Sequence, residues 1–308
     1  MIAVFLETLP FFLLVGLGYA AAAAGFFPQA AVAWLTRFVF FFALSAMLFR
    51  FAATLPVSQI LDLRFMGAYL LATGALYVAI TAFALIGRRS AAEAAVEAQC
   101  ATIGNVGFLA IPMLVALMGE AAAPAVLMVL TVDLIVFGSL IVLIITGSRD
   151  GRLSPAVLVT MGKGLLRNPM VMSITAGLAW SLMVLPIPDP AMRFLDILGA
   201  AATPCALFAI GASLAGKAAE RPILALWLST AKLVLHPALV ALCALVLFEI
   251  DPFMAAVMIA TAAMPTAGNV FMIAQHYGVA PQRASSTILV STVASVVTLS
   301  FVLSLLDY

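Results

Sequence analysis

Two short segments share a residue pattern and hold the side chains best suited to bind a ligand: Gly104-Asn105-Val106 and Gly268-Asn269-Val270. A carboxamide offers both hydrogen-bond donors and acceptors. Each segment lies within a long apolar run, with Pro112 after the first and Pro265 before the second. Glycine and proline weaken or break a helix, so each run is predicted to form a broken helix.

A broken helix exposes backbone N–H groups and the positive end of a helix dipole, which are natural partners for a carboxylate. We therefore expect a binding site for a small organic anion between the two breaks. The alternative is that each asparagine only caps its own half-helix. Thr102 and Thr266 could add hydroxyl contacts or merely bond back within their helices. The expected substrate-binding residues are Asn105, Asn269, Gly104, Gly268, Pro112, Pro265 and Thr266.

The ionisable candidates are Asp133, Lys232 and His236. Asp133 is the acidic residue deepest in a predicted span, and a carboxylate inside a membrane is a functional-site hypothesis by default. It could carry a proton, bind sodium or pair with a cation. Lys232 and His236 lie one helical turn apart and share a face. Two interpretations stay open: Asp133 couples transport to an ion, or it is the structural partner of Lys232. His236, next to Pro237, could instead form hydrogen bonds with backbone groups that the proline leaves without partners.

The elements that position these residues are membrane spans. The 308 residues are 66% hydrophobic and 9% charged, with a mean hydropathy of +1.24, whereas a soluble domain is about 25% charged. The net charge of +1 gives no argument for a nucleic-acid partner. Three isolated cysteines and two histidines suggest neither a disulfide framework nor a metal site, and no cofactor is expected.

Ten apolar runs approach the ~20 residues that a bilayer requires, and the first, starting at Ile2, is interpreted as a span rather than a removed signal peptide. Lys and Arg concentrate in alternate loops, which predicts that those loops are cytoplasmic and that both termini lie outside the cytoplasmic membrane. The predicted spans are 3–24, 29–53, 64–86, 94–118, 123–147, 167–185, 191–215, 223–248, 253–276 and 284–306.

The two halves of the chain, 1–150 and 151–308, share a pattern. A shift of 159 residues places Gly18 on Gly177 and Phe49 on Phe208, and a shift of 164 superimposes the two Gly-Asn-Val segments. Five spans per half is an odd number, so the second half is predicted to be inverted, as in many secondary transporters. The shift of 159 also makes Arg37 equivalent to Asp196. We expect these two residues to make structural or dimer contacts.

Several segments together resemble the auxin efflux carrier family, which includes bacterial malonate and malate permease-like members. They are LPFFLLVGLGYAAAAAGFF, ATIGNVGFLAIPMLVALMGE, RNPMV, AATPCALFAIGASLAG, AAMPTAGNVFMIAQHYG and ILVSTVASVVTL. The resemblance implies ten helices in two inverted repeats of five, with broken helices four and nine crossing. It also implies a homodimer, a scaffold of helices 1, 2, 6 and 7, and an elevator-type transport domain of helices 3–5 and 8–10.

The sequence departs from the family pattern in two places. Ser45 stands where many members have proline in the second helix, so a kink there is not expected. The long soluble loop of the plant auxin exporters is absent, which argues against auxin as the substrate.

The expected function is therefore secondary transport of small carboxylates across the cytoplasmic membrane by alternating access. The alternatives are a sodium-coupled organic-anion symporter of the bile-acid-carrier type and a membrane channel. The absence of a strong cluster of sodium ligands favours uniport or proton coupling. An enzyme is not expected, since the sequence contains no HExxH, GxSxG or GxGD motif.

Overall fold

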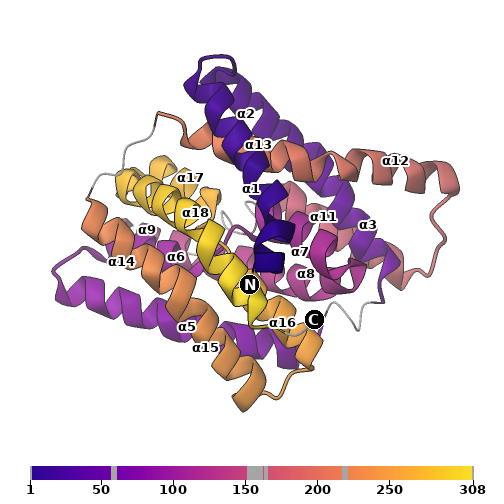
Figure 1. Ribbon diagram of the computed structural model, residues 1–308. Coiled ribbons are helices and arrows are strands. Elements are labelled where there is room, and N and C mark those ends of the chain that lie inside the picture. The colour runs from indigo at the N-terminus through magenta and orange to yellow at the C-terminus, as the bar shows by residue number, and fades with distance from the viewer. Residues whose placement is uncertain (1, 57–60, 151–161, 163–165, 217–220, 307–308) are drawn as a thin grey trace.

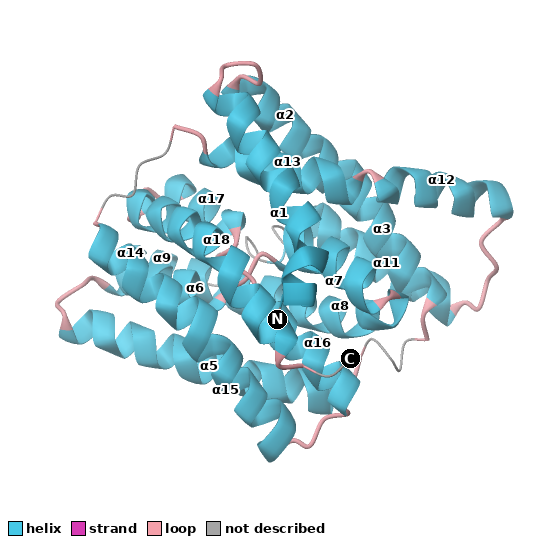
Figure 2. Ribbon diagram, viewed as in Figure 1, coloured by secondary structure: helices cyan, strands magenta, loops and turns pink. Residues whose placement is uncertain are grey.

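A computed structural model describes residues 2–56, 61–150, 162, 166–216 and 221–306. Helices and their connecting loops account for almost all of these residues (Figure 2), and the exception is one isolated backbone bridge. The sequence also predicts a basic linker between the two halves, at about 148–166, and this segment lies mostly outside the described residues. The arrangement of the helices is shown in Figure 1.

Up to residue 150 the helices follow the predicted spans, several of them interrupted by short π or 3-10 turns (labelled η). They are α1 (Ile2–Ala23), α2 (Gln29–Phe38), η1 (Val39–Ala43), α3 (Leu44–Thr54), α5 (Leu63–Ile86), α6 (Ala91–Thr102), η2 (Val106–Ala110), α7 (Ile111–Met118), η3 (Glu120–Ala122), α8 (Ala123–Val132), η4 (Asp133–Phe137) and α9 (Gly138–Asp150).

After residue 165 the same pattern returns. The helices are α11 (Pro169–Leu182), α12 (Asp189–Ala200), α13 (Ala202–Leu214), α14 (Pro222–Thr230), η5 (Ala231–Leu235), α15 (His236–Ala241), η6 (Leu242–Leu247), α16 (Pro252–Ala262), α17 (Gly268–His276) and α18 (Pro281–Ser304).

Within the described residues, seven helical stretches are long and apolar enough to cross a membrane. Three further apolar helices, Val106–Met118, Pro169–Leu182 and Pro252–Ala262, are shorter. Two of the three belong to the segments predicted to be broken, which explains why they do not reach the full length. Helix is found in each of the ten predicted spans, while ten membrane crossings remain a prediction.

Short polar side chains mark where several helices begin. Asp62 accepts hydrogen bonds from the first backbone N–H groups of α5, and Asn168 and Asp251 do the same for α11 and α16. Ser90 and Glu93 form a reciprocal capping box at the start of α6. Such caps satisfy N–H groups that a helix leaves without partners, so they fix the helix ends within a nearly continuous apolar sequence.

The helices pack in two groups, which the sequence alone does not reveal. In one group α1 packs along α13 and α3 packs along α11, with α2 and α12 beside them. In the other group α5 packs along α6 and α14 along α18, together with α8, α9, α15, α16 and α17. In Figure 1 the first group occupies the top and right of the view, and most of the second group the left and bottom, with α8 right of centre.

Glycine allows the closest helix contacts in the first group. A Cβ atom built on Gly18 of α1 would collide with the backbone carbonyl of Phe208 in α13. A Cβ atom on Gly177 of α11 would lie 2.7 Å from the carbonyl oxygen of Phe49 in α3. Larger side chains would force both helix pairs apart, as is usual where small residues line membrane helix contacts. The two contacts join the residues that the shift of 159 made equivalent.

The second predicted span is not a uniform α-helix. Residues Val39–Ala43 form a π turn between α2 and α3, and the Ser45 hydroxyl donates a 3.0 Å hydrogen bond to the carbonyl of Phe40. Ser45 stands where many members of the resembling family have proline. A π turn also frees backbone groups, so the helix is irregular at this place even without proline.

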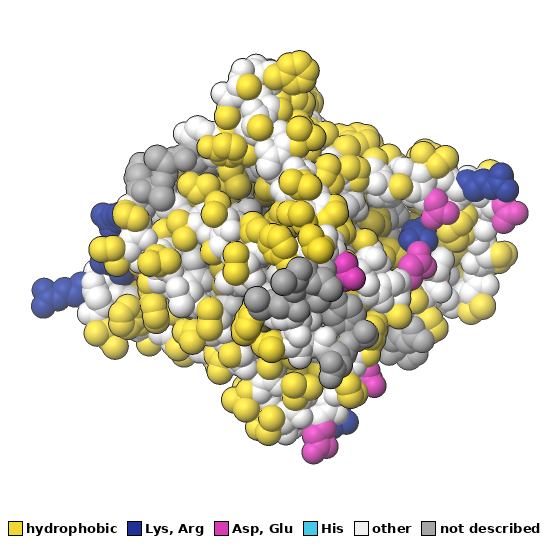
Figure 3. Space-filling model, in the orientation of Figure 1, with side chains coloured by type: hydrophobic (Ala, Val, Ile, Leu, Met, Phe, Trp, Pro, Cys, Tyr) yellow, Lys and Arg dark blue, Asp and Glu magenta, His cyan; other side chains and the backbone are white. Residues whose placement is uncertain are grey.

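Figure 3 shows a largely apolar surface with few charged side chains, several of which lie towards the left, right and lower margins of the view. Arg50 pairs with Glu120 and Asp196, and Arg64 pairs with Glu249. Arg283 pairs with Glu93 and Glu97, and Arg89 also pairs with Glu97. Counted along the predicted spans, Arg50 and Arg64 belong to loops predicted to lie outside, and Arg89 and Arg283 belong to loops predicted to be cytoplasmic.

The two ends of the described chain lie side by side, because the Thr8 and Ser300 hydroxyls are 2.9 Å apart. An even number of spans requires both termini on one side. Which side that is remains a prediction.

Candidate functional site

The two predicted breaks meet in space. Helix α6 ends at Thr102 and α16 ends at Ala262, and the segments that follow form a short antiparallel bridge between Gly104 and Thr266. The Asn105 N–H donates to the Pro265 carbonyl over 2.8 Å, and the Ala267 N–H donates to the Ile103 carbonyl over 3.0 Å. Backbone groups freed by each break therefore find partners in the other, as a membrane interior demands.

Side chains near Thr266 form further hydrogen bonds with the backbone of the two broken segments. The Thr266 hydroxyl donates to the carbonyl of Cys100 in α6 over 2.8 Å, and its backbone N–H donates to the Ser291 hydroxyl of α18 over 3.1 Å. The Thr102 hydroxyl instead bonds back to the carbonyl of Ala98. Thr266 thus ties the two broken segments together, whereas Thr102 shows the local bonding that was the alternative for both residues.

Neither candidate asparagine caps a helix through its side chain. Asn105 is the N-cap residue of η2 and is half-buried, but its carboxamide makes no capping hydrogen bond. Asn269 is the second residue of α17 and is exposed, and the N-cap of that helix is Ala267. The half-helices η2–α7 and α17 both begin at the crossing. Both carboxamides therefore lie at the N-terminal ends of half-helices without serving as caps.

The two prolines play different local roles. Pro265 is buried within the non-helical segment and accepts the hydrogen bond from Asn105. Pro112 is buried near the start of α7, directly after the π turn Val106–Ala110. Proline has no backbone N–H, and Pro112 stands where the π turn has already changed the hydrogen-bond pattern of the helix. The first break lies at residues 103–105, several residues before Pro112.

A buried polar network lies against the crossing. Lys232 in η5 is completely buried, and its Nζ donates to the carbonyl of Ala262, the last residue of α16, over 2.5 Å. Its Nζ also lies 3.1 Å from His236 Nδ1, and His236 Nε2 lies 3.0 Å from the Thr73 hydroxyl. A Cβ atom built on Gly104 would be 3.3 Å from Lys232 Nζ. The ammonium group is therefore next to the first break.

Asp133 joins this region through a different partner. Its Oδ1 accepts a 2.8 Å hydrogen bond from the Tyr69 hydroxyl, and the Tyr69 ring packs edge-on against His236 with centroids 5.9 Å apart. Among the described residues Asp133 and Lys232 form no ion pair, and Asp133 Oδ2 has no hydrogen-bond partner. The pairing of Asp133 with Lys232 is thus not direct.

Sequence reasoning missed Tyr69, Thr73 and Glu97. Tyr69 and Thr73 have the same four-residue spacing as Lys232 and His236, and both pairs are related by one shift of 163 residues (232 − 69 and 236 − 73). That shift falls between the two that aligned the halves and could have identified both residues.

Glu97 is a second acidic residue buried within a predicted span, with 5% of its side chain exposed. Its partner Arg283 is 186 residues away, so the pairing is invisible in the local sequence.

The remaining charged candidates lie away from the crossing. Arg37 stacks on Trp34 with its guanidinium carbon 4.9 Å from the ring centroid, and Asp196 pairs with Arg50 rather than with Arg37.

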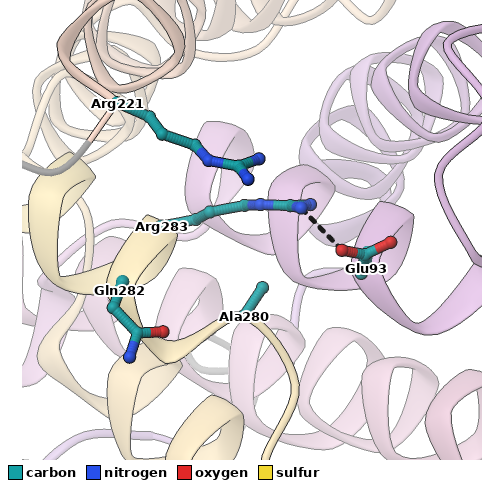
Figure 4. A pocket seen from close by; sticks show the side chains of 5 residues that line it. All are labelled: Glu93, Arg221, Ala280, Gln282 and Arg283. Carbon is teal, nitrogen blue, oxygen red and sulfur yellow. Dashed lines mark hydrogen bonds and ion pairs between the residues drawn. The ribbon is translucent and has the colours of Figure 1, made fainter.

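A pocket of about 170 Å³ opens where α6, α14 and α18 begin. Figure 4 shows the Arg221 side chain reaching alongside that of Arg283, which binds Glu93. The pocket is lined by Glu93, Arg221, Ala280, Gln282 and Arg283, none of which was a predicted site residue.

Comparison with known proteins places this geometry in context. The sequence profile of a family described as "Membrane transport protein" matches residues 3–303. A protein of Rhizobium meliloti (strain 1021) named "Putative malonate transporter" is 33% identical over 304 residues, covering 97% of this chain and 94% of that protein. Both similarities span nearly the whole chain, including the crossing and the buried network.

Proposed function

Because the chain belongs to the membrane transport protein family of the auxin efflux carrier type, we propose that it is a secondary transporter of small carboxylates. The observation that carries the proposal is the crossing, where two half-helices begin beside Asn105 and Asn269. Half-helix N-termini attract carboxylates. The name of the Rhizobium relative makes malonate the first substrate to test.

We further propose ten crossings of the cytoplasmic membrane in two inverted repeats, 1–150 and 151–308, with both termini outside. The paired contacts of Gly18 with Phe208 and of Gly177 with Phe49 support this arrangement, since a two-fold axis between inverted repeats would generate one contact from the other. The repeated pairs Tyr69–Thr73 and Lys232–His236 support it independently.

The proposed mechanism is alternating access of the elevator type. The helix group of α1, α2, α3, α11, α12 and α13 would be the scaffold, corresponding to predicted helices 1, 2, 6 and 7. The group that contains the crossing would move relative to it. The support is the separate packing of the two groups, because contacts within each group involve long helix faces and contacts between them are fewer. The scaffold is also the proposed site of homodimer formation.

The test is uptake of labelled malonate into proteoliposomes that contain the purified protein. Asn105→Ala and Asn269→Ala should each lower uptake and malonate affinity by about tenfold or more, because each removes a polar group that would bond the substrate carboxylate. Asn168→Ala is the matched control. This third asparagine caps α11 through its side chain, so its loss should cost stability, about 1 kcal/mol, and leave affinity unchanged.

Two outcomes would contradict the proposal. One is wild-type malonate affinity in both site variants. The other is malonate flux at channel rates, without the saturation and counterflow that a carrier cycle produces. Measuring uptake with and without sodium, and with and without a pH gradient, identifies the coupling ion in the same preparation.

A further inference from the structure

Lys232 is a buried cation without a carboxylate partner in the described part of the chain. The side chain is completely buried, and its two hydrogen-bond acceptors, the Ala262 carbonyl and His236 Nδ1, are uncharged when the imidazole is neutral. An ammonium group is only a donor, so His236 Nδ1 must accept from it and His236 Nε2 then donates to Thr73. The network fixes the position of the ammonium, and none of these hydrogen bonds goes to a carboxylate.

The position of the ammonium ties this charge to the crossing. Ala262 ends α16, and the C-terminal end of a helix attracts a cation. On the other side lies Gly104, where an added Cβ atom would be 3.3 Å from Nζ and 3.4 Å from Cε of Lys232. Gly104 directly precedes Asn105. The charge therefore lies within one residue of the proposed site, in an interior where salt screens it weakly.

In the proposed site, the two half-helix N-termini and the two carboxamides would hold one carboxylate of the substrate. A second carboxylate on the same substrate would bring a further negative charge against the buried network behind the crossing, which is costly unless a cation compensates it. Asp133, the nearest acidic candidate, is bonded to Tyr69 and not to Lys232. Asp133 therefore acts on Lys232 only through space and occupies none of its hydrogen-bonding positions.

We infer that Lys232 is the specificity-determining residue of the carrier: its fixed ammonium beside Gly104 makes the crossing prefer a dicarboxylate to a monocarboxylate. The inference rests on the proposed function and adds a substrate class to it. Lys232 acts through its field and through the position of the first break, and is a positioning residue rather than a direct ligand.

The experiment compares two ligands of nearly equal shape. Malonate carries two negative charges at neutral pH and monomethyl malonate carries one. Dissociation constants for both are measured by calorimetry on the purified wild type, Lys232→Gln and Lys232→Met. Glutamine keeps a hydrogen-bond donor without the charge, and methionine keeps only the bulk. Arg37→Gln, which removes an exposed cation on α2, is the control for a change in net charge.

Wild-type protein should bind malonate at least about tenfold more tightly than the monoester, and both Lys232 variants should lose most of that ratio, since a nearby charge discriminates between charge states. Arg37→Gln should keep the ratio. A structural role alone would weaken both ligands equally. An unchanged ratio in folded Lys232→Gln would overturn the inference, and so would a wild type that does not distinguish the ligands.

A second variant covers the case in which neither Lys232 variant folds. Gly104→Ala keeps the charge but places a methyl group against the ammonium and should reduce the ratio; an unchanged ratio there counts against the inference. Failure of the wild type to bind or transport any carboxylate would be a different result. It would refute the proposed function itself and the inference with it.

Discussion

At the scale of single residues, the polar groups that matter are those whose partners lie far away in the sequence. Thr266 and Thr102 have equally ambiguous local patterns, yet one bonds across the crossing and the other along its own helix. Asp133 and Lys232 are opposite charges in apolar surroundings, and their contacts go to Tyr69 and Ala262 instead.

The role of the Asp133 carboxyl group can be tested directly. If it carries a proton during the cycle, Asp133→Asn should abolish the pH dependence of net malonate transport, because an amide cannot titrate. Malonate binding should survive, since Tyr69 can still donate to the amide oxygen and the loss of stability should be about 1–3 kcal/mol. The measurement is the initial uptake rate across a range of pH values in proteoliposomes.

Tyr69→Phe is the control for that experiment. It removes the same 2.8 Å hydrogen bond but leaves the carboxyl group able to titrate, so the pH dependence should persist with a shifted midpoint. If Asp133→Asn is stable and its uptake follows the wild-type pH profile, Asp133 carries no proton.

At the scale of elements, the sequence predicts where helices lie better than how they contact one another. The extent of each helix depends on local apolar length and on caps such as Asp62 and Ser90, and these are visible in the sequence. The rotation of one helix against another depends on packing over the whole bundle. For that reason the Gly-Asn-Val breaks were predictable, whereas the Asn105–Pro265 bridge and the Tyr69–Asp133 bond required the structure.

The ion pairs of Arg283 should hold the start of α18 to α6. Arg283 is 11% exposed, binds Glu93 and Glu97 at 2.6 and 2.7 Å, and leaves Glu97 only 5% exposed. Removing one partner of a buried pair costs about 3–5 kcal/mol. Because Glu97 keeps a 3.4 Å contact with Arg89, Arg283→Gln should lose an amount near the lower end of that range, measured as the unfolding free energy in detergent.

Arg64→Gln is the comparison, since the Arg64–Glu249 pair is exposed and 3.9 Å apart, and such pairs contribute about 0–1 kcal/mol. Adding Glu97→Gln to Arg283→Gln should restore part of the loss by removing the stranded carboxylate. Equal stability of the two arginine variants would show that the buried pairs do not hold these helices together.

At the scale of the whole molecule, the ion pairs among the described residues form two clusters. Arg50 and Arg64 pair with Glu120 and Glu249, and Arg283 pairs with Glu93 and Glu97. The sequence predicts that the basic residues of the two clusters lie on opposite sides of the membrane. The assignment was possible because the bias of Lys and Arg between loops is a property of composition, which needs no knowledge of packing.

Labelling with membrane-impermeant thiol reagents tests the assignment. In a chain lacking Cys100, Cys205 and Cys243, single cysteines next to Glu120, Asp189 and Glu249 should react in intact cells. Cysteines next to Arg89, Arg152 and Arg221 should react only after the membrane is opened. The reverse pattern would invert the proposed orientation, and a mixed pattern would refute ten crossings. Malonate uptake by each labelled variant checks that the fold is intact.

The backbone bridge at the crossing also limits how the molecule can move. Asn105 and Ala267 donate hydrogen bonds to Pro265 and Ile103 across the two segments, and in a membrane protein a peptide group that loses such a partner is costly. Pulling the segments apart would strand four peptide groups at once, whereas shifting them together strands none. We therefore expect the two broken helices to move as one rigid body, held together by the bridge. Any flexibility must then lie in the loops that lead to them.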